Sequence, residues 1–183
     1  MKIAGSQVRI RTFEAAAIAL GGDADVVADT ALDAAEDTEV LATAFDGQPD
    51  VARNVTVKGN DANVTGDVVV EGFDLDGGAI TETIALNGAT LVAGNRAFAE
   101  ITAITLPPYD TANTERVRIG LGAKIGLPVR LNRDTVIAAF LDNVREATRP
   151  TVATSLATLS ANTVTLDSAL DGSGVLVDFY ETQ

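Results

Sequence analysis

From residue 38 onward, apolar and small polar side chains alternate along the chain with a period of two residues. Such alternation puts successive side chains on opposite faces of a β-strand. The runs are short, rich in Val, Ile and Thr, and bounded by Gly, Asn, Asp or Pro, as is typical of strands joined by turns. The strands that we expect span residues 38–45, 53–59, 66–75, 79–86, 98–106, 115–122, 135–143, 151–157, 162–167 and 175–182. The pattern predicts an all-β fold, a β-sandwich or barrel-like domain of short antiparallel strands.

Three places along this pattern have a local explanation. Asp76, Gly77 and Gly78 separate two alternating runs, and glycine tolerates the positive φ of a tight turn, so residues 66–86 are predicted to form one long hairpin. Pro107 and Pro108 remove two amide donors in succession, so the preceding strand must end at Leu106. Residues 132–142 fit a helical face as well as a buried strand, and we favour a strand.

The first 37 residues differ in composition from the rest of the chain, because they are rich in Ala and Asp and poor in large apolar side chains. We interpret residues 1–37 as an acidic N-terminal arm, extended or partly helical, and residues 38–183 as the β-sandwich domain. Within the arm, the segment from Thr12 to Leu20 is a candidate short helix, with Thr12 as its N-cap and two glycines as its end. A solvated, disordered leader is the alternative for a segment of this composition.

Charge and composition exclude several classes of function. The formal net charge is −13 and the pI is near 4.2, so the molecule repels phosphate backbones, and we expect no direct contact with nucleic acid. The 183 residues include no cysteine and no histidine, which removes the thiolate nucleophile, the commonest general base and the commonest transition-metal ligands. The N-terminus lacks the apolar core of a signal peptide, and no apolar run is long enough to span a membrane.

Three candidate sites have simpler explanations. Asp74 and Asp76 stand at the first and third positions of a calcium-like loop, but the next positions do not continue the motif, and a hairpin turn explains them. The glycines of residues 120–128 do not have the spacing of a dinucleotide or phosphate loop and suit a bulged strand. Glu71 and Glu82 would suit the carboxylate pair of a sugar-cleaving enzyme, but there is no Trp to form a sugar platform, and we interpret both as solvated acids. We expect no enzyme activity and no catalytic, cofactor-binding or metal-binding residues.

Four segments together carry a resemblance to a family: "PDVARNVTVKGN", "VTGDVVVEGFDLDGGAITETIALNGATLVAGNRAFAEITAITLP", "VRIGLGAKIGLPVRL" and "VDFYET". In this order they resemble small structural proteins of tailed-phage and prophage heads, which act as decoration, cement or head-fibre-like components. The resemblance covers residues 49–182 and implies no catalytic residues. It implies a virion protein on the capsid exterior, made in the host cytoplasm, which binds the major capsid protein and stabilises the shell.

The expected partners are the major capsid protein and further copies of the chain, as a trimer or dimer. The arm would bridge neighbouring subunits and become ordered as it binds. The alternative is a phage tail or appendage β-module, either tail-tube or adhesin-like. The residues that we expect to contact a partner are Arg9, Arg11, Phe13, Arg116 and Arg118.

Overall fold

The computed structural model describes residues 9–34, 36–111 and 113–181, which form β-strands joined by turns and two single-turn 3₁₀ helices. The strands in the first half of the chain are β1 (Arg9–Ala15), β2 (Val27–Ala31), β3 (Thr38–Leu41), β4 (Arg53–Gly59), β5 (Asp67–Phe73), β6 (Ala79–Ala85) and β7 (Val92–Phe98). Those in the second half are β8 (Glu100–Leu106), β9 (Arg116–Gly126), β10 (Val136–Leu141), β11 (Val144–Arg145), β12 (Thr151–Ala153), β13 (Thr163–Thr165) and β14 (Val175–Glu181). The 3₁₀ helices are η1 (Ala42–Ala44) and η2 (Leu159–Ala161). The predicted all-β architecture is confirmed.

The strands pair into three antiparallel sheets. One has the order β1-β14-β10-β11, one the order β12-β13-β9-β4-β7 with β2 also paired to β9, and one the order β3-β8-β5-β6. The second and third sheets enclose a core that includes Val55, Val57, Phe98, Ile104 and Ile119. This is the packing of a β-sandwich, with one buried face on each sheet.

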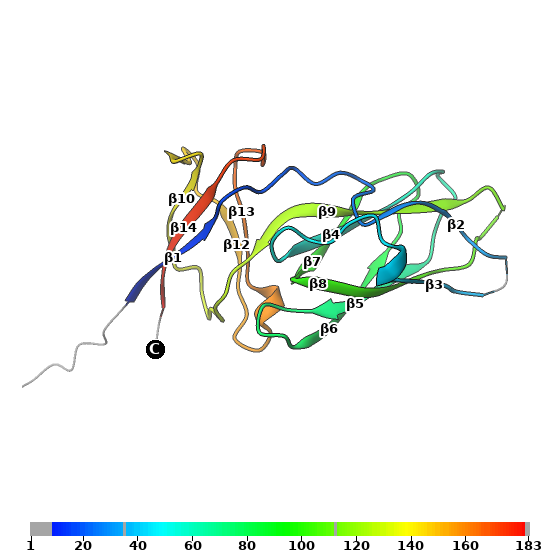
Figure 1. The fold of residues 1–183 in the computed structure, drawn as a ribbon, viewed down its shortest axis with the longest axis horizontal. Helices are drawn as coiled ribbons and strands as arrows, with labels where there is room; N and C mark the ends of the chain where they lie inside the picture. Colours follow the sequence, from blue (N-terminus) through cyan, green and yellow to red (C-terminus); the bar gives the residue numbers. More distant parts are fainter. Residues whose placement is uncertain (1–8, 35, 112, 182–183) are drawn as a thin grey trace, which may run out of the picture.

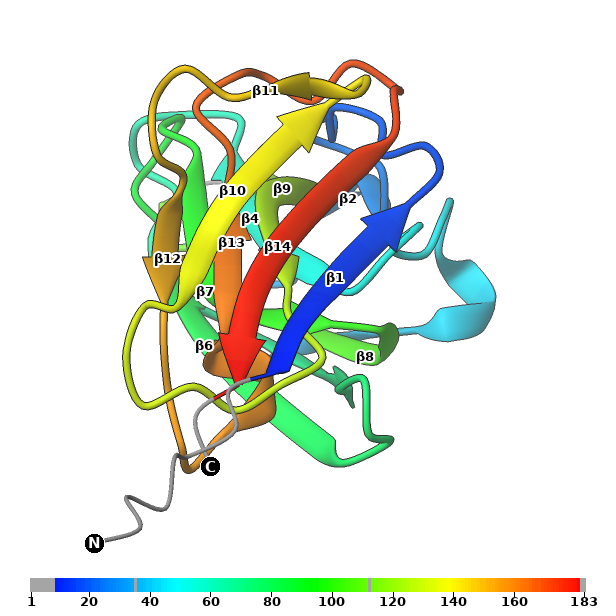
Figure 2. The same cartoon turned by 90° about the vertical axis from the view of Figure 1, so that its left-hand side faces the viewer.

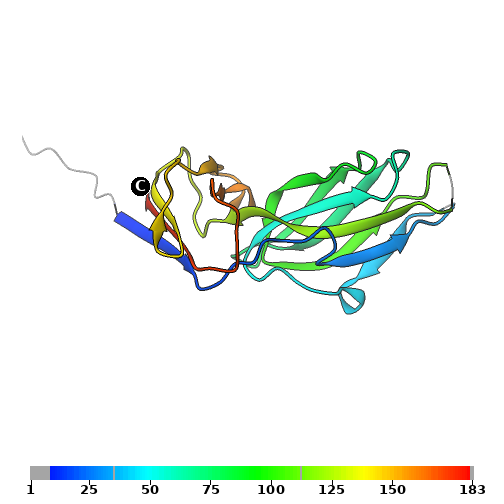
Figure 3. The ribbon, with the colours of Figure 1, turned by 90° about the horizontal axis from the view of Figure 1, so that it is seen from above.

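The molecule is elongated and has two lobes (Figure 1). The large lobe is the sandwich, and the small lobe consists of the sheet β1-β14-β10-β11 packed against β12, β13 and the end of β9. The small lobe has a core of its own, which includes Leu127, Leu131, Val177 and Phe179. Strand β9 runs from the large lobe into the small one, as the view from above also shows (Figure 3).

A buried arginine fastens the two lobes where they meet. The Arg53 side chain donates hydrogen bonds to the carbonyl oxygens of Gly122, at 2.7 Å, and Ala19, at 2.9 Å, and contacts the Asp50 carboxylate at 3.1 Å. Ala19 lies on the connection between β1 and β2, which crosses from the small lobe to the large one. Burying a guanidinium is costly unless such partners surround it, so this connection is held to β4 and β9.

Most of the predicted strands are confirmed. The hairpin of residues 66–86 forms from β5 and β6, which pair from Asp67↔Ala85 to Phe73↔Ala79, and Gly77 has a φ of 76° in its turn. Strand β8 ends at Leu106, immediately before the two prolines. The ambiguous segment forms strand β10, with Val136 and Ala139 facing the small-lobe core.

The N-terminal segment differs from the prediction. The helix expected from Thr12 to Leu20 is wrong, because residues 9–15 form β1, which pairs along its length with β14. The segment expected to be an arm also supplies β2, which pairs with β9, and it buries Ile18, Val26 and Leu32. The physical reason is tertiary: β14 offers a strand partner, and its hydrogen bonds outweigh the local helix preference of an Ala-rich segment. Residues 1–8 of the expected arm lie outside the described part of the chain.

Candidate interaction surface

One face of the sheet β1-β14-β10-β11 packs on the small-lobe core and the other faces outward at the end of the molecule (Figure 2). Along β14, Val175, Val177 and Phe179 are buried, so the alternate residues point away from the core. Strand register brings the outward residues of β1 and β10 beside them. The outward face is formed by Ile10, Thr12, Glu14, Ala138, Phe140, Leu176, Asp178 and Tyr180.

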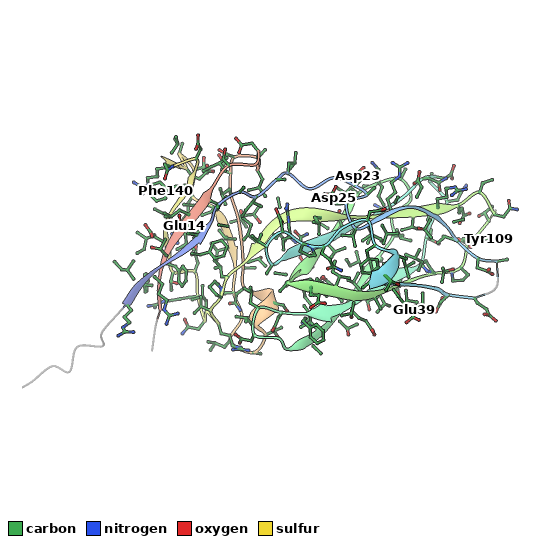
Figure 4. The ribbon with its side chains drawn as sticks, in the orientation of Figure 1. Glu14, Asp23, Asp25, Glu39, Tyr109 and Phe140 are labelled. Carbon is green, nitrogen blue, oxygen red and sulfur yellow. The ribbon has the colours of Figure 1, made fainter. Side chains whose placement is uncertain are left out.

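This outer face is apolar over much of its area. Ile10, near the start of β1, is 69% exposed. Phe140 and Leu176 are directly opposite one another and half-buried, and Figure 4 labels Phe140 in the small lobe. At the centre, the Thr12 hydroxyl donates a 2.6 Å hydrogen bond to the Asp178 carboxylate. The face thus has apolar side chains toward two ends and a polar pair between them, and exposed apolar groups bordered by polar ones are typical of protein–protein contact surfaces.

Three of the five predicted contact residues lie on this sheet. Arg9, Arg11 and Phe13 alternate along β1 and therefore share one side of the strand, the side that faces the small-lobe core. Phe13 packs against that core, while the two arginines lie nearer the end of the strand and are exposed. Beside Phe13 is a hollow of about 490 Å³, lined also by Val51 and Leu75, with mostly apolar walls.

The other two predicted contact residues lie at the opposite end of the molecule. Arg116 and Arg118 begin strand β9 in the large lobe, far from β1 (Figure 1). Arg118 forms a bidentate ion pair with Asp29 of β2, in which Nε lies 2.5 Å from Oδ1 and Nη2 lies 3.0 Å from Oδ2. The Arg116 guanidinium donates to the backbone carbonyl oxygen of Asp29 at 3.4 Å. The hydrogen bond from Arg118 holds the pKa of the Asp29 carboxyl below its ordinary value. The five residues therefore do not form one surface, and Arg118 is already used in holding β2 to β9.

The carboxylates that the sequence offered as a pair are separated by the hairpin. Val70 is directly opposite Glu82, and Glu71 is directly opposite Thr81, so Glu71 and Glu82 point to opposite faces. Glu71 is exposed as expected, but the interpretation of Glu82 as a solvated acid is wrong. Its buried carboxylate accepts hydrogen bonds from the backbone amides of Asn95, at 2.5 Å, and Arg96, at 3.2 Å, and so ties β6 to β7.

The other two candidate sites are structural features. The Asp74 carboxylate accepts the amides of Asp76 and Gly78 at 3.0 and 2.9 Å, which closes the hairpin turn. In residues 120–128, a Cβ atom at Gly120 would lie 1.9 Å from the Gly22 carbonyl oxygen, so this glycine permits close backbone packing against the connection from β1 to β2. The described residues contain no cluster of three or more acidic, His or Cys side chains that could hold a metal ion. No helix in this part of the chain has the length and hydropathy to cross a membrane.

The sequence did not identify the outer face itself. The alternation "RIRTFEA" of residues 9–15 was available as a strand signal, but the register that brings Ile10 beside Tyr180 joins opposite ends of the chain. Comparisons with protein-family models, curated proteins and solved structures give no match for this chain. The argument for function therefore depends on the surfaces that the structure presents.

Proposed function

We propose that the chain is a virion structural protein that decorates the outer surface of a tailed-phage head and stabilises the shell. The observation that carries the proposal is the exposed sheet at one end of an elongated body, with an apolar outer face around Ile10, Phe140 and Leu176. This face suits attachment to another protein surface. The resemblance of residues 49–182 to head-decoration proteins supplies the identity of that surface, the major capsid protein.

The electrostatics of the chain agree with this role. A net charge of −13 keeps free molecules apart before assembly and disfavours contact with the packaged genome. The charged side chains of the outer face are Glu14, Asp178 and the nearby Arg145, and a partner that buries them must offer polar groups to pair with them. The interface would consequently combine apolar contact at Ile10, Phe140 and Leu176 with polar contact around Asp178.

The stabilising effect follows from mass action. A protein that binds only the assembled shell shifts the equilibrium toward that shell by an amount that grows with occupancy and affinity. We expect several copies to contact each capsomer, as a trimer or dimer, so that modest single contacts sum over the head. The alternative, a tail or appendage β-module, would instead form rings or filaments without a capsid.

The test is to mix the purified chain with heads that lack accessory proteins and to image them by electron cryo-microscopy. Regular added density on or between capsomers, with the small lobe toward the shell, is the expected result. Bare heads beside rings or filaments of the protein alone would favour the tail or appendage module and reject decoration.

Matched variants test the surface. Ile10→Glu replaces a well-exposed apolar side chain at the β1 end of the outer face by a charge, and we expect it to remove the added density. Leu41→Glu makes the same kind of change on β3 of the large lobe, where Leu41 is 51% exposed, and should leave decoration intact. Equal occupancy by both variants would show that the outer face is not the attachment surface.

A further inference from the structure

Strand β1 leaves one edge of the small-lobe sheet open. It is the terminal strand in the order β1-β14-β10-β11, and among the described residues it pairs only with β14. In an antiparallel ladder, alternate residues direct their N–H and C=O groups away from the paired neighbour. Over the seven residues of β1, several backbone donors and acceptors therefore face outward and form a template for another strand.

The opposite edge of the same sheet is closed by its own chain. Beyond β10, the amide of Glu146 donates to the Ala139 carbonyl oxygen at 2.9 Å. The Arg149 guanidinium donates to the Val136 carbonyl oxygen at 2.9 Å and is held by Asp134 at 2.8 Å. These contacts occupy acceptors that an incoming strand would need. The last strand on this side, β11, has only two residues, so the β1 side is the edge of this sheet that is long enough for strand addition.

The side chains of β1 define what such a strand would carry. Arg9, Arg11 and Phe13 share one side of β1 and are spaced two residues apart. The hollow of about 490 Å³ beside Phe13 also borders Leu75, which is 41% exposed, and Val51. A strand added to β1 would set its own alternate residues against these three positions. Carboxylates suit the two arginines, and an apolar side chain suits Phe13 and the hollow.

We propose that β1 is a strand-addition site for an extended, acidic segment of a partner protein, with acidic residues opposite Arg9 and Arg11 and an apolar residue opposite Phe13. The inference rests on the proposed function, for which it names the chemistry of the capsid segment. A second copy of β1 fits less well. It would bring two further guanidinium groups into the same short ladder, where like charges on neighbouring strands destabilise pairing.

The probe is a blocked seven-residue peptide, Val-Thr-Val-Thr-Glu-Thr-Glu, which in antiparallel register puts its two glutamates opposite Arg11 and Arg9. Its matched control has Lys in place of both Glu. Binding is followed by amide chemical shifts of the ¹⁵N-labelled chain at low salt, up to millimolar peptide. We expect shifts along β1 and binding of the acidic peptide at least tenfold tighter than that of the Lys peptide.

Charge reversal separates specific pairing from general attraction. In the double variant Arg9→Glu with Arg11→Glu, the preference should invert, so that the Lys peptide binds more tightly. Both positions are exposed, and thermal unfolding of the variant checks that the fold is kept. An acidic peptide N-methylated on alternate residues retains its side chains but cannot complete the ladder, and it should not bind. No shifts on β1, or no inversion of preference, would overturn the proposal.

Self-pairing has a direct readout because the chain has no cysteine. A Thr12→Cys variant would form an intermolecular disulfide if two β1 strands met at a dyad through residue 12. Rapid cross-linking, with a dimer in sedimentation velocity that competes with the peptide, would assign the edge to a second copy and overturn the acidic partner. A chain that does not cross-link and binds the acidic peptide supports it.

The head-binding assay distinguishes failure of this inference from failure of decoration. If Arg9→Glu with Arg11→Glu decorates heads as the unmodified chain does, the β1 site is wrong and decoration stands. If the unmodified chain leaves heads bare while the peptide preference inverts as expected, decoration is wrong and the β1 site stands. Loss of head density in the variant together with inversion supports both.

Discussion

Asn162 gives the sharpest stability prediction for this fold. Its fully buried side chain lies at the end of η2 and accepts hydrogen bonds from the amides of Leu131, at 2.9 Å, and Ser155, at 2.8 Å. Its amide group donates to the carbonyl oxygens of Ser155, Thr158 and Leu159 at 2.9, 2.9 and 3.1 Å. One side chain thus organises the turn from β12 to β13 and fastens it to the segment before β10.

Replacing Asn162 by Ala removes all of these contacts at once. The two backbone amides then lose their acceptor in a buried place, and each such loss costs roughly 1–3 kcal/mol. The carbonyl oxygens lose their donors at a smaller cost, because the chain can relax around them. We therefore expect Asn162→Ala to lower the free energy of unfolding by about 3–5 kcal/mol, a large part of the ~5–15 kcal/mol of a typical domain.

Urea unfolding followed by circular dichroism measures this loss. The midpoint should fall, and an unchanged slope would show that the native state remains compact. Asn63→Ala is the control, since Asn63 is exposed on the connection between β4 and β5 and uses its backbone amide, not its side chain, in its hydrogen bond to Asp61. Asn162→Asp keeps the acceptor oxygen but turns a second oxygen toward three carbonyl oxygens, so it should destabilise the fold through lost donated hydrogen bonds and the burial of a carboxyl group. A loss below about 1 kcal/mol for Asn162→Ala would refute the assignment of these amides to this side chain.

Three further predictions concern the large lobe. Arg118→Gln should raise the pKa of Asp29 toward its ordinary value in a carboxyl NMR titration. The low pKa of Asp29 stabilises the folded state at pH values above the unfolded-state pKa, and this stabilisation is lost as the pH falls through the folded-state pKa. The variant should therefore lose less stability on acidification, by a small amount because the ion pair is exposed. Glu82→Gln presents an NH₂ group to one of two buried backbone amides and should cost about 1–2 kcal/mol, whereas Glu71→Gln on the exposed face should be neutral in the same thermal scan. Gly77→Val forces a β-branched residue to a φ of 76° and should cost at least about 1–2 kcal/mol; an unchanged melting temperature would contradict the turn geometry.

The sequence predicts the strands whose signals are local. The hairpin of β5 and β6 follows from its alternation and its glycine turn, and the end of β8 follows from two prolines. The sequence pattern does not predict strand β7, because "VAGNRAF" has few β-branched residues and no strict alternation of apolar and polar side chains. Its pairing with β4 is a tertiary contact. Strand β1 was missed because its partner, β14, lies at the other end of the chain. Pairing across such a distance leaves little trace in a window of ten residues.

The residues predicted to contact a partner lie only partly on the candidate interaction surface. Arg9, Arg11 and Phe13 lie on the exposed sheet, whereas Arg116 and Arg118, which alternate along one strand, lie in the large lobe. Only the fold separates the two groups, because Asp29 approaches Arg118 through the pairing of β2 with β9. The outer face is assembled from β1, β10 and β14, which are distant in sequence, so no single segment is apolar enough to predict the face. A surface of this kind follows from register and not from composition.

The pairing of β1 with β14 also determines the order in which the two lobes can fold during synthesis. Thr12 and Asp178, which share a hydrogen bond, are 166 positions apart, so their strands cannot meet until β14 has been synthesised. The sandwich strands β2 to β9 are all synthesised earlier and have a core of their own. Folding during synthesis would thus form the large lobe first and complete the small lobe only after β14, in a slow, non-local step. A chain that ended before β14 would lack a central strand of the small-lobe sheet, so it would not present the outer face.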